Sequence, residues 1–506
     1  MKTTIVLPAA LVFIIVFFTH RLPAQTQPVQ LVGLTSYGGA NNSGTIVKMN
    51  SDGTGLTKIY DFAESTGWLP VGDLLQRPDG RLYGVCNEGG VDNSCVLFSF
   101  DPATGAYDSL FNYYEYTGDV PFSSLIPLPD GRLCGVATDG GVYNDGVIYA
   151  FDPTHLAYTD LYAFGADSAS SLNGPFGAPL LSADGNLYGM TTSTRWAQVG
   201  DSFVYSNGLI YSYNISTGVY TDLYDFTGSN DGNGYGSLVQ LANGKLYGMT
   251  SGDPYYWFGD GPAAYSFNAP GSYGNVFSFD PVSKTYTSLV NFNGTNGAAP
   301  FGSLLYASDG KLYGLTSQGG GYNYGTLFSL DPVTNTFTHL FDFDSVIAGA
   351  NPSGGLMQST DGNLYGSTFA GGASGVGTYF RFNPTSLQFT VINSLDGNTG
   401  ANPMGGSLAF YSPARDTQPA HYNVAFNIFP VPTDNSTTVQ LVVEANALAT
   451  MKLFDEAGNI VWSQQQQLIA GVNYTSIDVN LMAAGEYFLQ VDANGQKMTG
   501  KVMVQR

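Results

Sequence analysis

The stretch DGRLYG at residues 79–84 returns five more times along the chain, with small changes, and determines the predicted fold. The copies are DGRLCG at 130–135, DGNLYG at 184–189, NGKLYG at 243–248, DGKLYG at 309–314 and DGNLYG at 361–366. A seventh unit starts with LVGLTSYGG from Leu31, which lacks the Asp-Gly pair but matches LYGLTSQGG from Leu312. The motif leucines, at 31, 82, 133, 187, 246, 312 and 364, are 51 to 66 residues apart. A period of this length is typical of an array of supersecondary units.

Each unit predicts four β-strands. In the sixth unit these are GSLLYAS (302–308), LYGLTS (312–317), GTLFSL (325–330) and FTHLFDF (337–343). Asp-Gly between the first and second strands is a hairpin signal, because glycine tolerates the positive φ of a tight turn. Asp-Pro after the third strand starts the turn into the fourth, since proline fixes φ. The tight connections therefore join the four strands into one antiparallel sheet, and only the crossover to the next sheet is long.

Seven such sheets predict an all-β fold, a seven-bladed β-propeller over residues 31–412. The first unit begins with its second strand, so it has no first strand of its own. At the other end, the stretch PMGGSLAFYS from Pro403 contains a first strand that no further strands of a unit follow. We therefore expect the ring to close by pairing Ser407–Tyr411 with Leu31–Ser36, because an open array would leave two bare sheet edges.

The two ends of the chain differ from the repeats. Residues 1–24 combine Lys2, an apolar run from Ile5 to Phe18 and the small residue Ala24, which indicates a cleaved signal peptide rather than a membrane span. The mature chain is thus expected to have no transmembrane segment. A polar linker at 413–423 leads to residues 424–506, whose alternating apolar pattern predicts a small Ig-like β-sandwich.

Composition excludes several functions. Of 506 residues, 65 are glycine and only 11% are charged, which disfavours helices. The net charge of −22 repels phosphate backbones, so no nucleic-acid partner is expected. No metal site is predicted from the three cysteines and scattered histidines. The segment SNDGNGYG from Ser229 offers oxygen ligands for calcium but lacks EF-hand spacing, and no other cofactor is indicated.

The cysteines allow one disulfide. Cys86 and Cys95 flank a glycine-rich loop between two expected strands, so their side chains could face each other across the open end of a hairpin. Export would supply the oxidising environment that such a bond requires. Cys134 replaces the motif tyrosine and is expected to be a buried thiol.

Two units are longer than the others, and both insertions fall between the second and third strands. They are TTSTRWAQVGDSFVYSNG from Thr191 and TSGDPYYWFGDGPAAYSFNAPGSYG from Thr250. These loops and the crossovers should share one face of the ring. We therefore take the aromatic residues of this face as ligand-binding candidates, since they suit stacking on sugar rings or packing against a protein. The candidates are Trp68, Trp196, Tyr205, Tyr255, Tyr256, Trp257 and Phe258. No catalytic residue is predicted from a motif, and loops that merely cap the central channel are the alternative.

The repeats resemble the GloVer "choice-of-anchor" tandem-repeat family in the phrases DGNLYGSTFAGG, GTLFSLDP and PFGSLLYASDG. That resemblance implies no particular activity. The tail resembles a type A C-terminal sorting domain of type IX secretion in FNIFPVPTDN, LFDEAGNIVW, GVNYTSID, LMAAGEYFLQV and KVMVQR. Its matching residues are Pro430, Pro432, Gly458, Gly485, Tyr487 and Lys501, with Val431 interrupting the usual Pro-Asn-Pro.

This second resemblance implies that the type IX secretion machinery is a partner, and that the protein is secreted or attached to the outer-membrane surface after export through the periplasm. Three functions follow as hypotheses. The first is a non-catalytic module that binds a glycan or a surface protein. The second is a polysaccharide lyase or hydrolase that uses Asp201, Asp253 or Asp260. The third is a purely structural surface protein.

Overall fold

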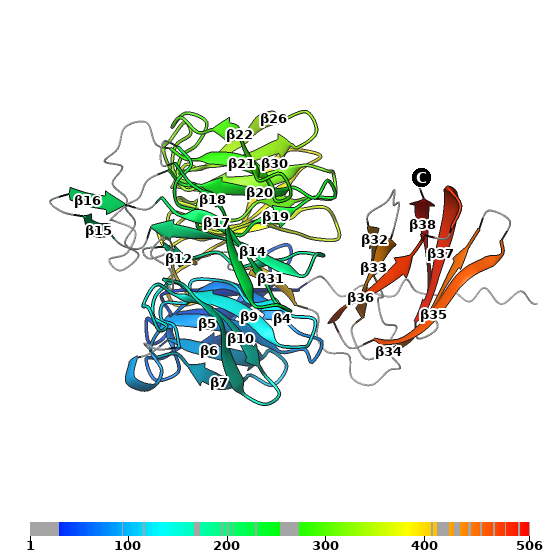
Figure 1. Ribbon diagram of the computed structural model, residues 1–506. Coiled ribbons are helices and arrows are strands. Elements are labelled where there is room, and N and C mark those ends of the chain that lie inside the picture. Colours follow the sequence, from blue (N-terminus) through cyan, green and yellow to red (C-terminus); the bar gives the residue numbers. More distant parts are fainter. Residues whose placement is uncertain are drawn as a thin grey trace, which may run out of the picture.

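The computed structural model is an all-β protein (Figure 1). It describes residues 30–504 except for 94, 115–116, 166–172, 194–195, 200–201, 206, 228–229, 253–272, 406–407, 412–424, 430–435, 444–446, 456–457, 469–470, 481 and 494–495. Within these residues the regular elements are 38 strands and one 3₁₀ helix, η1 (Val91–Asn93). The predicted signal peptide and linker lie outside the described residues.

Seven antiparallel sheets cover the repeats, and each contains strands in the predicted order. The first four are sheet 1 with β31 (Leu408–Tyr411), β1 (Gln30–Thr35), β2 (Thr45–Asn50) and β3 (Thr57–Asp61); sheet 2 with β4 (Trp68–Gln76), β5 (Leu82–Glu88), β6 (Val96–Asp101) and β7 (Ala106–Asn112); sheet 3 with β8 (Ile126–Pro127), β9 (Leu133–Ala137), β10 (Val147–Asp152) and β11 (Ala157–Ala163); and sheet 4 with β13 (Leu180–Leu181), β14 (Asn186–Ser193), β17 (Leu209–Asn214) and β18 (Val219–Asp225). In sheet 4, β12 (Asn173–Pro175) also pairs with β14.

The remaining three repeats follow the same order. They form sheet 5 with β19 (Val239–Gln240), β20 (Leu246–Thr250), β21 (Asn275–Asp280) and β22 (Thr285–Asn291); sheet 6 with β23 (Leu305–Tyr306), β24 (Leu312–Thr316), β25 (Thr326–Asp331) and β26 (Thr336–Asp342); and sheet 7 with β27 (Met357–Gln358), β28 (Leu364–Thr368), β29 (Thr378–Asn383) and β30 (Gln388–Ser394).

The repeated Asp-Gly pair forms the predicted hairpin turn. In sheet 6, the Gly310 N–H donates to the Ala307 carbonyl at 3.0 Å, and Gly310 has a φ of 81°. The Asp309 carboxylate accepts the Lys311 N–H at 3.2 Å and the Tyr313 hydroxyl at 2.8 Å. The aspartate of the motif therefore stabilises the turn by bonding both to a backbone amide within it and to the tyrosine of the strand that follows.

The glycine of the motif makes room for an aromatic ring. Gly314 on β24 is the register partner of Phe328 on β25. A Cβ added at Gly314 would lie 2.4 Å from Cζ of that ring, a distance that no side chain tolerates. The same pairing joins Gly84 to Phe98 on sheet 2. In the Leu-Tyr-Gly triplet, the leucine is thus buried in the strand, the tyrosine bonds to the aspartate of the turn, and the glycine leaves room for the aromatic ring.

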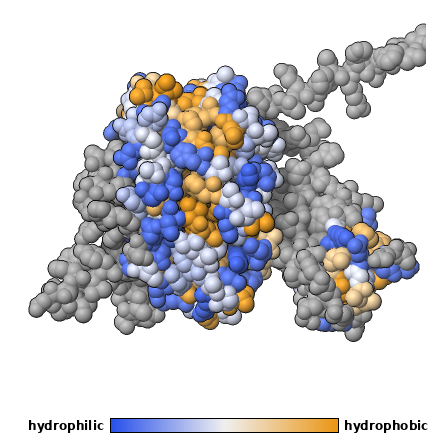
Figure 2. All heavy atoms as spheres, turned by 90° about the horizontal axis from the view of Figure 1, so that it is seen from above, coloured by the Kyte–Doolittle hydropathy of each residue, from blue (hydrophilic) through white to orange (hydrophobic). Residues whose placement is uncertain are grey.

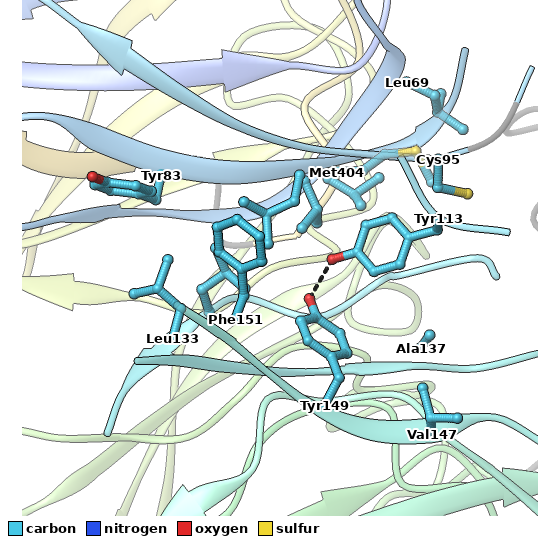
Figure 3. Packing of buried hydrophobic residues seen from close by; sticks show 14 of the residues in the cluster. Leu69, Tyr83, Cys95, Tyr113, Leu133, Ala137, Val147, Tyr149, Phe151 and Met404 are labelled. Carbon is cyan, nitrogen blue, oxygen red and sulfur yellow. Dashed lines mark hydrogen bonds between the residues drawn. The ribbon is translucent and has the colours of Figure 1, made fainter. Parts of the chain in front are cut away.

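Buried residues form a hydrophobic cluster between every two consecutive sheets. The cluster between sheets 2 and 3 contains Leu69, Val85, Phe151 and the buried pair Tyr113 and Tyr149 (Figure 3). In that pair the Tyr113 hydroxyl donates to the Tyr149 hydroxyl at 2.6 Å. Equivalent clusters join each of the other neighbouring sheets from 1 to 7.

The first and last parts of the repeat region are also joined. Strand β31 pairs with β1, with Gln30 opposite Tyr411 and Gly33 opposite Leu408. A further cluster that includes Leu31, Tyr365 and Tyr379 connects sheet 7 to sheet 1. The two strands named in the prediction therefore pair over residues 30–33 and 408–411, and Ser407, which the prediction also included, lies outside the described residues.

The C-terminal region has two sheets around one core. One contains β32 (Ala425–Phe429), β33 (Ser436–Val443) and β36 (Gly471–Asp478), and the other β35 (Ile460–Leu468), β34 (Ala447–Phe454), β37 (Gly485–Ala493) and β38 (Gln496–Val504). Leu441 from the first sheet and Leu453 and Leu489 from the second belong to the same buried cluster.

The repeat region exposes mixed side chains on the side seen in Figure 2, where hydrophobic residues are interspersed with hydrophilic ones. Isolated exposed apolar residues are normal for a folded protein.

Candidate functional site

Loops and crossovers gather at one end of sheets 1–7. We call this end the insertion face. It comprises the connections β1–β2, β5–β6, β9–β10, β14–β17, β20–β21, β24–β25 and β28–β29, together with the crossovers between sheets. Side chains in three of the loops hold the next crossover: Ser36 Oγ donates to the Pro70 carbonyl at 2.8 Å, and Thr138 and Ser317 make the equivalent bonds to Pro175 and Pro352.

The first insertion contains an additional hairpin, β15 (Trp196–Val199) and β16 (Ser202–Tyr205), which projects from the repeat region in Figure 1. The register places Trp196 opposite Tyr205 and Gln198 opposite Phe203. Two candidates from distant parts of the loop are thus brought together by the backbone. Tyr255, Tyr256, Trp257, Phe258 and the aspartates Asp201, Asp253 and Asp260 lie outside the described residues.

The insertion face also carries exposed tyrosines that the sequence analysis did not single out. Tyr143 is 50% exposed, Tyr322 is 62% exposed, and Tyr114 and Tyr324 are also exposed. Among the described residues of sheets 1–7, the one other strongly exposed tyrosine is Tyr306, near the Asp-Gly turn at the opposite end. The sequence feature that could have identified these residues is a tyrosine shortly after Gly-Gly, which occurs in the β9–β10 and β24–β25 loops.

These loops are consecutive. Tyr143 lies in the loop of sheet 3, the insertions belong to sheets 4 and 5, and Tyr322 and Tyr324 lie in the loop of sheet 6. Exposed apolar residues in neighbouring connections extend this surface, and they are Val91, Val142, Val346 and Ile347. Among the described residues, the insertion face therefore presents exposed aromatic and apolar groups in connections that follow strands of sheets 2, 3 and 6.

Trp68 is less available than predicted. It is the first residue of β4, opposite Glu88 on β5, and its half-buried indole packs against the cluster between sheets 2 and 3. Burial and the negative charge of Asp119 raise the pKa of the Glu88 carboxyl. Trp68 therefore contributes more to the packing beneath this part of the insertion face than to its exposed surface.

A polar depression of about 580 Å³ lies on the insertion face between sheets 1 and 2. The Gly90 N–H donates to the Glu64 carbonyl at 2.7 Å and fixes the two sides of the depression together. Amide, hydroxyl and carboxylate groups can each bond to a polyhydroxylated ligand. The lining residues are Asn41, Ser43, Ala63, Glu64, Ser65, Gly90 and Asn93.

The disulfide that the sequence allowed is not formed. Cys86 and Cys95 are both buried and free. The register partner of Cys86 is Val96, not Cys95, and a shift of one residue turns a side chain to the other face of a sheet. Cys86 accordingly packs between sheets 1 and 2, whereas Cys95 packs between sheets 2 and 3. Cys95 Sγ donates to the Asn87 carbonyl at 2.8 Å and to Asp119 Oδ1 at 3.1 Å.

The calcium candidate is already engaged by protein donors. Asp231 Oδ1 accepts the Thr227 hydroxyl at 2.6 Å, and Oδ2 accepts the Tyr224 hydroxyl at 3.2 Å. Within the described part of the chain, no three His, Cys, Asp or Glu side chains are grouped as metal ligands would be.

The C-terminal candidates have structural roles where they are described. The Tyr487 hydroxyl donates to the Ala483 carbonyl at 2.9 Å, and Lys501 pairs with Glu486 at 2.6 Å across β37 and β38. Gly458, with a φ of 84°, closes the turn between β34 and β35, and Gly485 starts β37. Pro430 and Pro432 lie outside the described residues.

No helix in the described residues has the length and hydrophobicity to cross a membrane. No curated protein matches the chain. Among solved structures, it is similar to a proposed 6-phosphogluconolactonase from Bacteroides uniformis, with 13% identity, 76% of this chain and 100% of the other covered, and a TM-score of 0.49. A proposed 6-phosphogluconolactonase from Bacteroides fragilis is 14% identical, with 77% of this chain and 99% of the other covered and a TM-score of 0.49. A Synechocystis apocarotenoid oxygenase variant is 11% identical, with 76% of this chain and 93% of the other covered and a TM-score of 0.43.

Two family profiles match the chain itself. The Gloeobacter/Verrucomicrobia repeat covers residues 23–203 and 263–412, and the secretion system C-terminal sorting domain covers residues 427–505. The match to the sorting domain indicates export to the cell exterior or surface and a partner in the type IX secretion machinery. The chain therefore belongs to the Gloeobacter/Verrucomicrobia repeat family and ends in a secretion system C-terminal sorting domain.

Proposed function

We propose that this protein is an extracellular, non-catalytic glycan-binding module. Its signal peptide, residues 1–24, would direct it to the periplasm, and the sorting domain would then direct it through the outer membrane. The ligand would bind at the insertion face. The observation that carries the proposal is the concentration of exposed tyrosines there, at Tyr114, Tyr143, Tyr322 and Tyr324.

Two further features support a glycan as the ligand. Trp196 and Tyr205 are opposite each other on the β15–β16 hairpin, and flat aromatic rings suit the apolar faces of sugars. The depression lined by Asn41, Glu64 and Asn93 adds hydrogen-bonding groups for hydroxyls. A ligand that contacts both the hairpin and the depression would combine apolar contacts with hydrogen bonds, as recognition surfaces commonly do.

We further propose that residues 31–412 form a closed seven-bladed β-propeller and that residues 424–506 form an Ig-like sandwich. The clusters between consecutive sheets, the pairing of β1 with β31 and the contact of sheet 7 with sheet 1 support the ring. The two sheets of the tail share one core, and the hydrogen bond from Tyr487 to a backbone carbonyl four residues upstream is a feature of Ig-like sandwiches.

The test is a glycan-array screen of the mature secreted protein, followed by product analysis on every polysaccharide that it retains. We expect retention to fall at least tenfold in Tyr322→Ala and in Trp196→Ala. Tyr306→Ala is the matched control, because Tyr306 is an exposed tyrosine away from the insertion face and its loss should leave retention unchanged.

The other outcomes contradict the proposal in different ways. New chain ends in the retained polysaccharide would make the protein an enzyme, and Asp201→Asn, Asp253→Asn and Asp260→Asn would then identify the residues required. If Tyr322→Ala and Trp196→Ala are retained as well as the wild type, the ligand does not bind at the insertion face. No retention on any glycan would favour a protein ligand or a structural role.

A further inference from the structure

The four-stranded sheet of the C-terminal region has one face on the core and one face toward solvent. Its strands lie side by side in the order β35, β34, β37 and β38 (Figure 1). Along β37, Leu489 and Val491 belong to the buried core cluster, whereas Phe488 and Gln490 do not. Because successive side chains of a strand point to opposite faces, Phe488 lies on the outer face. The outer face of such a sheet is ordinarily polar.

One row of residues across this outer face is apolar. The register places Phe454 on β34 opposite both Ile460 on β35 and Phe488 on β37. Ile460 is 52% exposed and Phe488 is 41% exposed, and none of the three belongs to the core cluster. Directly opposed residues have Cβ atoms about 4.5–5.5 Å apart, so these side chains are contiguous. Val461, which has no register partner on β34, is also exposed beside them. We call Phe454, Ile460, Val461 and Phe488 the outer-face patch.

The patch ends where the neighbouring rows begin. The next two rows of the same face contain only polar residues, which are Lys452, Ser463 and Gln490 in one and Thr450, Gln465 and Asp492 in the other. Leu448, further along β34, is also exposed, but its register partner on β35 is Gln467. A single exposed apolar residue is normal, whereas a contiguous apolar patch with polar surroundings is typical of a surface that contacts another protein.

Two lysines border the patch. Lys501 on β38 is opposite Phe488 and pairs with Glu486 at 2.6 Å. Lys452 precedes Phe454 by two residues on the same face of β34, and none of the ion pairs of the described residues involves it. An apolar surface with an acidic group at its rim would therefore complement both the patch and Lys452.

The family match identifies the kind of partner. The sorting-domain match covers residues 427–505 and so includes the whole patch. In the described part of this domain, the large apolar residues that are strongly exposed are Ile460, Val461 and Phe488 of the patch, and Leu448. The patch is thus the place where the domain offers apolar contact area to the machinery that must recognise it.

We infer that a component of the type IX secretion machinery binds the sorting domain at the outer-face patch, through an apolar surface with an acidic group beside it. The exposed aromatic ring of Phe488 lies at the centre of this contact, and the charge of Lys452 orients the partner from one side. The inference rests on the family match of the tail and is independent of ligand binding at the insertion face.

The experiment measures export of the full chain from a bacterium that has type IX secretion. Immunoblots of cell fractions give the ratio of chain in the medium and on the cell surface to chain in the periplasm. We expect Phe488→Thr and Ile460→Thr each to lower this ratio by about fivefold or more, because a few apolar anchors carry most of the affinity of an interface. Threonine suits a strand, and both side chains are exposed, so the thermal unfolding midpoint should change little.

Leu448→Thr is the matched control. Leu448 is also 52% exposed and lies on the same sheet outside the patch, so Leu448→Thr should be exported like the wild type. Thermal unfolding of each full chain, purified from the periplasm, shows whether it is folded. The charge is tested separately: Lys452→Glu should lower export, whereas Lys311→Glu, which reverses the charge of an exposed lysine of the repeat region, should not.

Three results would overturn the inference. One is wild-type export of Ile460→Thr and Lys452→Glu, which decides the question even where Phe488→Thr has a lowered midpoint. Another is an equal loss of export in Leu448→Thr, which would assign the effect to the sheet as a whole. The third is a wild-type dimer in sedimentation that Phe488→Thr converts to a monomer without loss of export, which would make the patch a contact between two copies of this chain.

Discussion

Tyr211 is a tyrosine at a position where four other repeats have phenylalanine. It is the register partner of Gly189, as Phe98, Phe277, Phe328 and Phe380 are partners of the equivalent glycines. Its ring is fully buried, and its hydroxyl has no hydrogen-bond partner. Since a buried hydroxyl without a partner is destabilising, we expect Tyr211→Phe to raise the free energy of unfolding by about 1 kcal/mol in urea denaturation.

Tyr149→Phe is the matched control at the residue scale. Tyr149 occupies the same position in sheet 3, but its hydroxyl accepts the bond from Tyr113 at 2.6 Å, as Figure 3 shows. Removing that acceptor leaves the buried Tyr113 hydroxyl unpaired, so stability should fall by about 1–3 kcal/mol. Equal effects of the two substitutions would contradict this account of the ring position.

At the scale of the element, the turn between the third and fourth strands depends on one side-chain oxygen. Asp331 Oδ1 accepts the Val333 N–H at 2.8 Å, and Asp280 Oδ1 accepts the Val282 N–H at 2.9 Å. Asn383 makes the same bonds to Thr385 and Ser386 in sheet 7. The turn predicted after the third strand is therefore present, and the side-chain oxygen of an aspartate or an asparagine accepts its backbone amides in these sheets.

These turns predict how stability responds to acid. Bonds from the backbone amides of Val333 and Ser283 hold the pKa of Asp331 and Asp280 below its usual value. A lowered folded-state pKa gives stability that is present above the unfolded pKa, near 3.9, and is lost as the pH falls through the folded value. We therefore expect Asp280→Asn/Asp331→Asn to lose less stability than the wild type between pH 6 and about pH 3.

The measurement is the urea midpoint at each pH. Glu64→Gln is the control, since it removes a negative charge whose carboxylate accepts no hydrogen bond among the described residues, and it should follow the wild-type profile more closely. A double variant with the full wild-type loss in acid would mean that other carboxylates cause the acid sensitivity.

The elements show what the sequence could and could not predict. The Asp-Gly turns and the strand order could be predicted because every repeat contains the same local pattern. The pairing of β1 with β31 was expected for another reason: each end of the repeat region has the strands that the other end lacks. The state of Cys86 and Cys95 did not follow, because it depends on a single residue of register in the β5–β6 connection.

At the scale of the whole molecule, the pairing of β31 with β1 joins the two ends of the repeat region. Val32 is opposite Ala409, and both contact the cluster between sheets 1 and 2. We expect the double variant Val32→Cys/Ala409→Cys to form a disulfide, because directly opposed residues on antiparallel strands have close Cβ atoms. Since the bond would close a loop around all seven sheets, the oxidised form should be more stable than the reduced form by about 2–4 kcal/mol.

The prediction is checked by mass spectrometry of the intact chain and by urea unfolding with and without reductant. Because Cys86 is buried in the same cluster as Val32, peptide mapping must also show that the bond joins positions 32 and 409. Val32→Cys and Ala409→Cys alone are the controls, and reductant should not change their unfolding. If the ends of the repeat region were apart, the double variant would stay reduced or would link two chains, and its stability would not depend on the redox state. A monomeric bond that stabilises the protein would instead require β1 and β31 to lie side by side in solution, as their register places them.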